Sequence, residues 1–217
     1  MAFPRSPCGR GAKPRAAWQK AGETTILAGM TRKTIVAALT GLGLALALLA
    51  GPAEADQSDK QLPGLFAKLK MARSASEALP VEAAIWKRWS ETADDDARFP
   101  FSRGMESMEE QQFKESLGYF TEAVRRAPNF AEAWNKKATI EYLLGDYAAS
   151  VASIERTLAL EPRHFGALSG LGLINQQLDR DEAALKAFEA ALQVHPNLTS
   201  AKTRVKQLKE KRAGKPT

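Results

Sequence analysis

The chain has 217 residues, of which 44% are hydrophobic and 26% are charged, a composition typical of one globular domain of moderate size. Its net charge of +6 is carried by the two ends, because residues 56–198 sum to −5. This distribution leaves no basic domain surface to hold a phosphate backbone, which argues against DNA or RNA as a partner. The only cysteine, Cys8, lies near the N-terminus, so the rest of the chain has no disulfide or thiolate chemistry.

The N-terminal region contains the three parts of a secretory signal peptide. Residues 35–50 form an apolar run, two basic residues precede it, and the sequence Ala-Glu-Ala follows at 53–55. Small side chains at the first and third of these last positions suit the pocket of the signal peptidase. We therefore predict an exported, periplasmic protein whose signal peptide, residues 30–55, is cleaved after Ala55.

The place of the apolar run also favours a later start of translation. Counted from Met1, the segment before the run is too long for a signal peptide, whereas counting from Met30 gives an ordinary length. We predict that residues 1–29 are an untranslated leader. The alternative is an uncleaved inner-membrane anchor at residues 35–50, although this run is shorter than the roughly 20 residues that a spanning helix needs.

A helical hairpin is expected after the signal peptide. Residues 62–73 and 79–91 both have the pattern of helices, with Pro80 near the first turn of the second. That helix carries Trp86 and Trp89, and bulky aromatics near a helix seam are more often buried than stacked on a ligand. We expect both tryptophans to be core residues.

The central part of the chain repeats with a period of about 34 residues, a length known among helical repeat proteins. Three classes of position follow this period: a proline that ends a helix, a large apolar residue, and a small residue halfway along the preceding helix. They are Pro128, Pro162 and Pro196; Phe120, Ile154 and Phe188; and Gly104, Ala138 and Gly172. A small residue in one helix lets the large residue of the next helix approach closely, and the proline stops the second helix.

This pattern resembles the tetratricopeptide repeat (TPR), a helix–turn–helix module, in a small exported bacterial protein. The turn is best matched in the second unit, by Gly145 and Asp146, whereas the first unit has Gln111 where the turn glycine is expected. Asp146 and Asp179 suit both the turn and the start of the next helix. The resemblance implies an all-α fold, a right-handed α-solenoid of TPR repeats with a C-terminal capping helix.

The repeat register predicts the following division of the chain. The three units are TPR 1 at 97–130, TPR 2 at 131–164 and TPR 3 at 165–198, with a capping helix at 199–213 and a tail at 214–217. Residues 56–96 are expected to be a divergent TPR-like cap, aligned from about residue 63, or else an unrelated helical hairpin. In the capping helix, Val205 and Leu208 are the apolar residues expected to face TPR 3.

The resemblance also implies where a partner binds, because TPR arrays use the concave face lined by the first helix of each pair. The residues so placed are mostly apolar or amide side chains, which suit an extended or helical peptide. They are Phe101, Met105, Met108, Glu109, Asn135, Thr139, Tyr142, Leu143, Ser169, Leu173, Gln176 and Gln177. Leu143 and Leu173 have a second interpretation as core residues packed between helices.

Chaperone-binding members of the family hold a carboxylate terminus with a set of Lys, Arg and Asn side chains. In this chain Asn135 and Lys136 are adjacent, but the matching places elsewhere are taken by Ser102 and Gly170. We therefore do not predict recognition of a C-terminal carboxylate.

No set of residues in the sequence supports catalysis, a metal or a cofactor. His164 and His195 each lie beside a proline that ends a repeat, and we expect both to be exposed. The acidic run 94–96 lacks the spaced oxygens and the glycine of a calcium loop, and Ser150 and Ser153 lack a histidine partner for nucleophilic chemistry. The chain is predicted to be no enzyme.

The sequence therefore favours a protein–protein interaction scaffold or adaptor in the cell envelope, which binds a partner polypeptide in its concave TPR groove. The alternative is a membrane-associated envelope assembly factor. In that case the leader, or the basic helix around 202–212, would contact the membrane.

Overall fold

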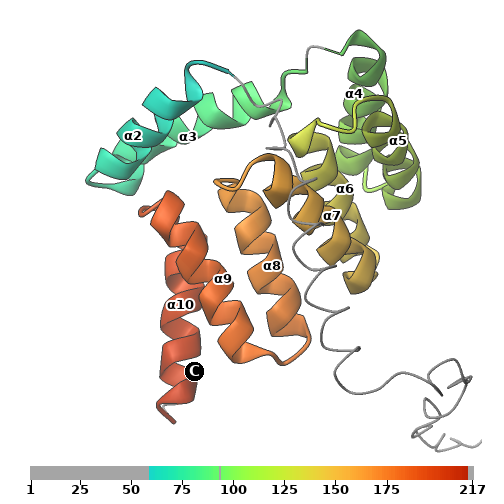
Figure 1. Ribbon diagram of the computed structural model, residues 1–217. Coiled ribbons are helices and arrows are strands. Elements are labelled where there is room, and N and C mark those ends of the chain that lie inside the picture. Colours follow the sequence, from blue (N-terminus) through green and yellow to red (C-terminus); the bar gives the residue numbers. More distant parts are fainter. Residues whose placement is uncertain (1–58, 93, 215–217) are drawn as a thin grey trace, which may run out of the picture. The chain divides into compact units, whose positions relative to one another are not determined.

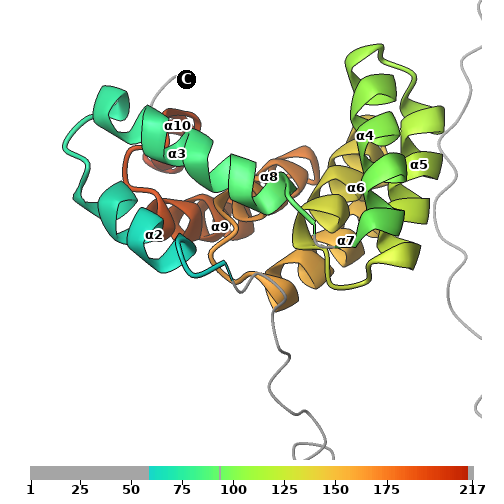
Figure 2. The same cartoon turned by 90° about the horizontal axis from the view of Figure 1, so that it is seen from above.

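The computed structural model describes residues 59–92 and 94–214 (Figures 1 and 2). The predicted leader, signal peptide and anchor lie outside these residues. The described part is built from helices, with no strand in it, and no helix in it is both long enough and apolar enough to cross a membrane. The helices are α2 Leu62–Met71, α3 Ala75–Ser90, α4 Asp95–Glu109, α5 Phe113–Arg126, α6 Ala131–Leu143, α7 Tyr147–Leu160, α8 Phe165–Gln177, α9 Asp181–Val194 and α10 Thr199–Arg212.

The helices α4 to α9 form three successive pairs, α4–α5, α6–α7 and α8–α9, and α10 packs against α9 (Figure 1). Within a pair the small residue of the first helix lies against the large residue of the second, as predicted. A Cβ atom added to Gly104 would lie 2.8 Å from the ring of Phe120, and one added to Gly172 would lie 2.6 Å from the ring of Phe188. These distances are well below ordinary contact, so only glycine permits this approach of the two helices.

The large apolar positions form the seam of the array. Phe120, Ile154 and Phe188 are all buried, and each belongs to a separate apolar cluster. The fold is therefore the all-α TPR solenoid that the repeat register predicts.

A buried hydrogen bond recurs in the first two pairs and was not predicted. The hydroxyl of Ser116 donates to the carbonyl of Gly104 at 2.8 Å, and that of Ser150 donates to the carbonyl of Ala138 at 2.7 Å. The two serines occupy equivalent places one repeat apart, and the third unit has Ala184 at this place. These bonds join the two helices of a pair at the point where they approach most closely.

Each pair turns through one residue in the left-handed conformation. Gln111, Gly145 and Asp179, at equivalent places in the three units, have φ values of 60°, 81° and 55°. In all three turns the next amide bonds to a carbonyl five residues earlier, as in a Schellman motif. Asp146 caps α7 as expected, accepting from the amide of Ala149 at 3.0 Å. Asp179 occupies the turn but does not cap α9, which has no side-chain cap.

The capping helix α10 covers the last pair. Ala201 and Leu208 are buried among Ala184, Leu185 and Phe188, and Val205 packs beside them. The basic side chains of α10 are exposed, and the helix therefore closes the apolar seam with a polar outer surface, as predicted.

The N-terminal hairpin α2–α3 differs from the sequence prediction at its second helix, which begins at Ala75 instead of residue 79. Ser74 starts this helix because its hydroxyl accepts from the amide of Glu77 at 3.2 Å, while the Glu77 carboxylate accepts from the amide of Arg73 at 2.9 Å. This reciprocal pattern is close to a capping box. Pro80 consequently lies inside the helix, one turn beyond its expected place.

The hairpin packs on the start of α8 and on the connection between α9 and α10 rather than continuing the stack in sequence order. Its apolar cluster takes in Phe165 at the start of α8, together with Val194 and Leu198 before α10. Trp89 is fully buried in this cluster, and Trp86 packs at its edge. The tryptophans thus fix the hairpin to the array, in agreement with their expected core role.

The prediction that both histidines are exposed is wrong. His164 and His195 are 0% and 1% exposed, because the hairpin covers the turns in which they lie. His195 Nε2 is 3.1 Å from a carboxylate oxygen of Glu82 on α3. His164 Nε2 is 2.9 Å from a carboxylate oxygen of Glu132 on α6, and its Nδ1 accepts from the amide of Ala167 at the start of α8.

Candidate functional site

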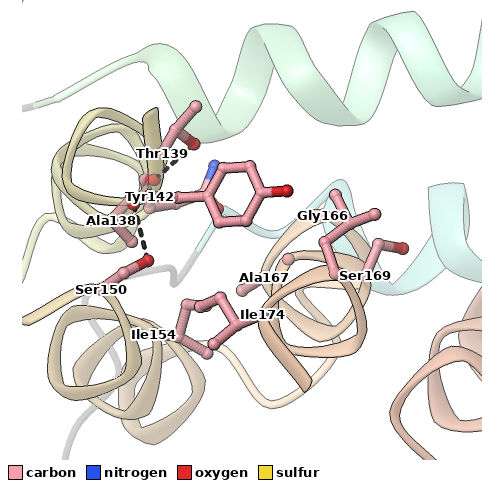
Figure 3. Close-up of a pocket in the computed structure, with 12 residues that line it drawn as sticks. Ala138, Thr139, Tyr142, Ser150, Ile154, Gly166, Ala167, Ser169 and Ile174 are labelled. Carbon is pink, nitrogen blue, oxygen red and sulfur yellow. Dashed lines mark hydrogen bonds between the residues drawn. The ribbon is translucent and has the colours of Figure 1, made fainter. Parts of the chain in front are cut away.

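A cavity of about 170 Å³ opens between the first helices of the second and third pairs, α6 and α8 (Figure 3). Its floor is formed by Ala138 and by Ile154 of α7, and its α8 wall includes Ala167 and Ile174. Small residues make the space. Gly166 and Gly170 both line it. A Cβ atom added to Gly170 would lie 3.4 Å from Cδ1 of Ile154, whereas one added to Gly166 would lie 2.6 Å from the ring of Trp86.

The structure brings five of the twelve predicted groove residues together around this cavity. They are Asn135, Thr139, Tyr142, Ser169 and Leu173. They come from two helices and lie about one turn apart along each, because residues three or four apart share one face of a helix. The predicted groove residues are thus concentrated between α6 and α8.

The other seven predicted residues do not line this cavity. Phe101 is a core residue, only 8% exposed, because its ring packs against Phe120 and Phe130. Met105 and Met108 are half-buried and pack against the apolar cluster that contains Phe101 and Phe120. Glu109, Leu143 and Gln177 are exposed at the far ends of their helices, and Gln176 lines a different cavity.

Sequence reasoning missed seven residues of the lining. They are Ala138, Ser150, Ile154, Gly166, Ala167, Gly170 and Ile174. Ala138 and Ile154 were predicted from the repeat register to pack against each other. The sizes of the side chains at these two positions also explain why they line the cavity. In the first and third pairs, a phenylalanine ring packs directly on the glycine of the first helix. In the second pair the alanine instead faces the smaller side chain of isoleucine, which fills less space.

The polar groups of the cavity are few and uncharged. The Ser169 hydroxyl oxygen is buried with no hydrogen-bond partner among the described residues. The Tyr142 hydroxyl accepts a long bond of 3.4 Å from Gln177, and its ring lies 5.6 Å from that of Tyr147. The Tyr142 hydroxyl is therefore a polar group that a guest can reach beside a mainly apolar space.

A buried charge lies one residue layer away from the cavity. Asn135, 7% exposed, donates from its amide to a carboxylate oxygen of Glu132 at 3.1 Å. Burial by itself raises the pKa of Glu132, but the hydrogen bond from His164 and the nearby Lys136 ammonium hold that pKa below its usual value. Glu132 is therefore ionised, and it orients Asn135 at the cavity wall.

Two further clefts are lined by residues of α9 and α10. Both include Asp181, Leu208 and Lys211, and the Lys211 ammonium is 2.6 Å from an Asp181 carboxylate oxygen. This ion pair belongs to the lining of both clefts. Among the described residues no cluster of three or more His, Cys, Asp or Glu side chains could hold a metal ion.

The chain matches the family model described as tetratricopeptide repeat over residues 101–156 and 144–198. A TPR repeat-containing protein of Rhizobium etli is 35% identical over 164 residues, which cover 75% of this chain and 80% of that protein. Hsp70-Hsp90 organizing protein 1 of Glycine max is 25% identical over 175 residues, 76% of this chain but 29% of that longer protein.

Solved structures show the same fold at lower identity. The first TPR of Spaghetti (RPAP3), bound to the HSP90 peptide SRMEEVD, has a TM-score of 0.54 at 19% identity, covering 56% of this chain and 97% of that chain. MamA has a TM-score of 0.52 at 16% identity, covering 73% and 85%. With the repeat register, the glycine–phenylalanine contacts and the Rhizobium etli relative in agreement, the chain belongs to the tetratricopeptide repeat family.

Proposed function

We propose that this protein is a non-catalytic adaptor that binds a partner polypeptide in the groove of its first helices, with one apolar side chain of the partner in the α6–α8 cavity. The observation that carries the proposal is the cavity itself. It lies on the face that TPR proteins use for binding, and five residues expected there from the sequence surround it.

The size and lining of the cavity define the side chain that fits. A dry apolar cavity of about 150 Å³ accommodates benzene, and this cavity measures about 170 Å³. A leucine, isoleucine or phenylalanine side chain has the matching size. A charged side chain would lose its hydration without meeting a counter-charge, because no ionised residue lines the cavity.

The proposed partner differs in chemistry from the acidic HSP90 peptide bound by the RPAP3 domain. Ser102 and Gly170 stand where the carboxylate-binding members of the family have cationic or amide side chains. Gly170 lines the cavity and adds space to it rather than charge. We therefore propose an apolar anchor rather than a terminal carboxylate as the group recognised.

We also propose that the partner belongs to the cell envelope, on the basis of the signal-peptide pattern of residues 30–55. N-terminal sequencing of the protein isolated from the periplasmic fraction tests this directly. The expected first residue is Asp56. A mature chain that retains residues 35–50 would favour the membrane anchor instead.

Site-specific photocrosslinking tests the binding site. A photoreactive amino acid in place of Tyr142 is expected to capture a defined protein under native conditions. The matched control is the same replacement at Lys186, which is exposed on α9, a second helix of its pair. Equal capture of the same protein from both positions, or no specific capture from Tyr142, would contradict the proposal.

A second variant separates loss of the cavity from loss of the fold. In Gly170→Phe the new ring is directed toward Ile154, whose Cδ1 atom would lie 3.4 Å from the added Cβ, an acceptable contact. The ring is expected to fill the cavity and to abolish capture from Tyr142, while the far-ultraviolet circular dichroism stays that of the parent. Undiminished capture would show that the cavity does not hold the partner.

A further inference from the structure

The outer side of the N-terminal hairpin combines exposed apolar residues with a basic rim. Met71 and Leu79 are 79% and 62% exposed, and they lie on either side of the turn that joins α2 to α3. Large apolar side chains with this exposure cost free energy in water unless a partner covers them.

Helical geometry places Met71 on the side of α2 that faces away from the array. The buried residues of this helix are Leu62, Phe66 and Leu69, and the helical repeat makes Met71 and Ala67 project to the opposite side. Ala67 is also exposed. The helix therefore has one covered apolar face, and on its open side Met71 and Ala67 are exposed.

The charge beside Met71 is mainly positive, and the Glu77 carboxylate lies at the same turn, where it accepts from the amide of Arg73 at 2.9 Å. Lys68 and Lys70 flank Met71 on α2, and Arg73 follows in the turn; all three are exposed. The α2 helix contains no acidic residue, and within residues 59–92 and 94–214 none of these three cations forms an ion pair. An apolar stripe between basic side chains is the pattern of helices that lie at the surface of an anionic membrane.

The basic helix α10, which the sequence suggested for membrane contact, has a different arrangement. Its apolar residues Leu208 and Ala201 are buried against α9. Two of its lysines already have partners, Lys209 with Glu189 at 2.7 Å and Lys211 with Asp181 at 2.6 Å. This helix has charge but no exposed large apolar side chain to insert.

We propose that the tip of the α2–α3 hairpin, rather than α10, binds an anionic lipid surface, with Met71 and Leu79 inserted among the acyl chains and Lys68, Lys70 and Arg73 at the phosphate groups. The face that binds lipid is separate from the α6–α8 cavity, which draws on no residue of the hairpin. The adaptor can thus hold a partner while its N-terminal hairpin lies on the membrane.

The test places an environment-sensitive fluorophore at the hairpin tip of the full chain. Replacing Cys8 by serine leaves no cysteine, so Met71→Cys can be labelled at one position. The matched control is Phe99→Cys, since Phe99 is 69% exposed on α4 next to Asp95 and Asp96. Vesicles are made from phosphatidylcholine alone or with phosphatidylglycerol added.

The expected result is a blue shift of the Met71 probe, and protection from iodide quenching, with phosphatidylglycerol vesicles only. The Phe99 probe should stay unchanged even if the apolar leader brings the whole chain to the vesicle. Reversing two charges, Lys68→Glu with Lys70→Glu, should weaken the response roughly thirtyfold or more, because each cation near an anionic surface contributes about a factor of five. Added salt should weaken it as well.

Three outcomes would overturn the proposal. The first is no shift at Met71, and the second is an equal shift at Phe99. The third is a Met71 shift that grows with protein concentration in the absence of vesicles, which would assign the face to a second copy of the chain. Crosslinking from Tyr142 is measured without lipid, so a failure of lipid binding leaves the partner proposal unaffected.

Discussion

Replacement of His164 by alanine removes three interactions of one fully buried side chain. Its Nδ1 accepts from the amide of Ala167 at 3.1 Å, its Nε2 lies 2.9 Å from the carboxylate of Glu132, and its ring stacks on Trp89 with centroids 4.0 Å apart. Because Nδ1 accepts an amide hydrogen, the ring proton is at Nε2, where it is donated to the carboxylate. The histidine thus joins α3, α6 and α8.

The expected loss of stability follows from these contacts. A helix N-cap contributes about 1 kcal/mol, and a hydrogen bond to a charged group about 1.5–3 kcal/mol. In the alanine variant the carboxylate of Glu132 still has Asn135 and Lys136 as partners, and these two contacts offset part of the cost of its burial. We expect His164→Ala to lower the free energy of unfolding by about 3–4 kcal/mol.

The control variant is His164→Asn, because asparagine caps a helix but is too short to reach Glu132. It should restore the cap contribution, about 1 kcal/mol, while the bond to Glu132 and the stacking on Trp89 remain lost. Urea denaturation followed by circular dichroism measures both changes. For a domain of 150–250 residues, the alanine variant should also melt about 6–16 °C lower.

Free energies of unfolding of both variants within about 0.5 kcal/mol of the parent value, the range of ordinary surface substitutions, would contradict this expectation. In that case His164 would not connect the hairpin to the array in solution. If asparagine destabilised the protein as much as alanine, the histidine would act through Glu132 and Trp89 alone, without an effect as a cap.

Three further predictions concern the repeats and the buried charge. Gly172→Ala should cost about 1–3 kcal/mol by overpacking against Phe188, measured as a lower urea midpoint. Gln111→Gly should raise the free energy of unfolding by about 0.5–1 kcal/mol. A non-glycine residue at positive φ costs about 1–2 kcal/mol, and the greater chain entropy of glycine in the unfolded state offsets part of the relief. In the same assay Gly145→Ala should be destabilising. The pKa of Glu132 is lowered by folding, so its contribution is complete above the ordinary value of 4.5 and is lost as the pH falls through the lower folded value. The destabilisation of Glu132→Gln relative to the parent should therefore shrink below pH 4.5, and a difference that grew there would contradict this assignment.

The array could be predicted from the sequence because the residues that pack against each other within a helix pair belong to the same repeat. Gly104 and Phe120 belong to the two helices of one pair, and equivalent pairs recur one period later and two periods later with small changes. Proline and glycine mark the ends and turns for local steric reasons. Such signals are short-range, and no distant part of the chain can override them in all three units.

The docking of the hairpin could not be predicted, because it rests on contacts between segments with no shared period. Glu82 meets His195 across 113 residues, and the side chain of Asn197 donates to the carbonyl of Ala72 across 125 residues. A histidine beside a proline looks exposed when only its own repeat is considered. The histidine becomes buried when the α2–α3 hairpin covers the turn. The sequence of the turn itself does not indicate that this happens.

The lining of the candidate cavity could be predicted in part for the same reason. The register identifies which helix faces the groove, and Asn135, Tyr142 and Leu173, named on that basis, lie beside the cavity. The register does not determine whether a side chain on that helix is buried in the core or exposed in the groove. Phe101 occupies a groove position by spacing, yet it turns into the core because Phe130 and Phe120 offer it aromatic contacts.

Binding of a partner in the cavity between α6 and α8 is tested most directly by amide hydrogen exchange, measured on the protein alone and on the protein with the partner identified by crosslinking. Slower exchange on binding is expected within residues 135–142 and 166–174, with α5, α7 and α9 unchanged away from the cavity. Protection confined to the second helices of the pairs, with residues 135–142 unaffected, would contradict it.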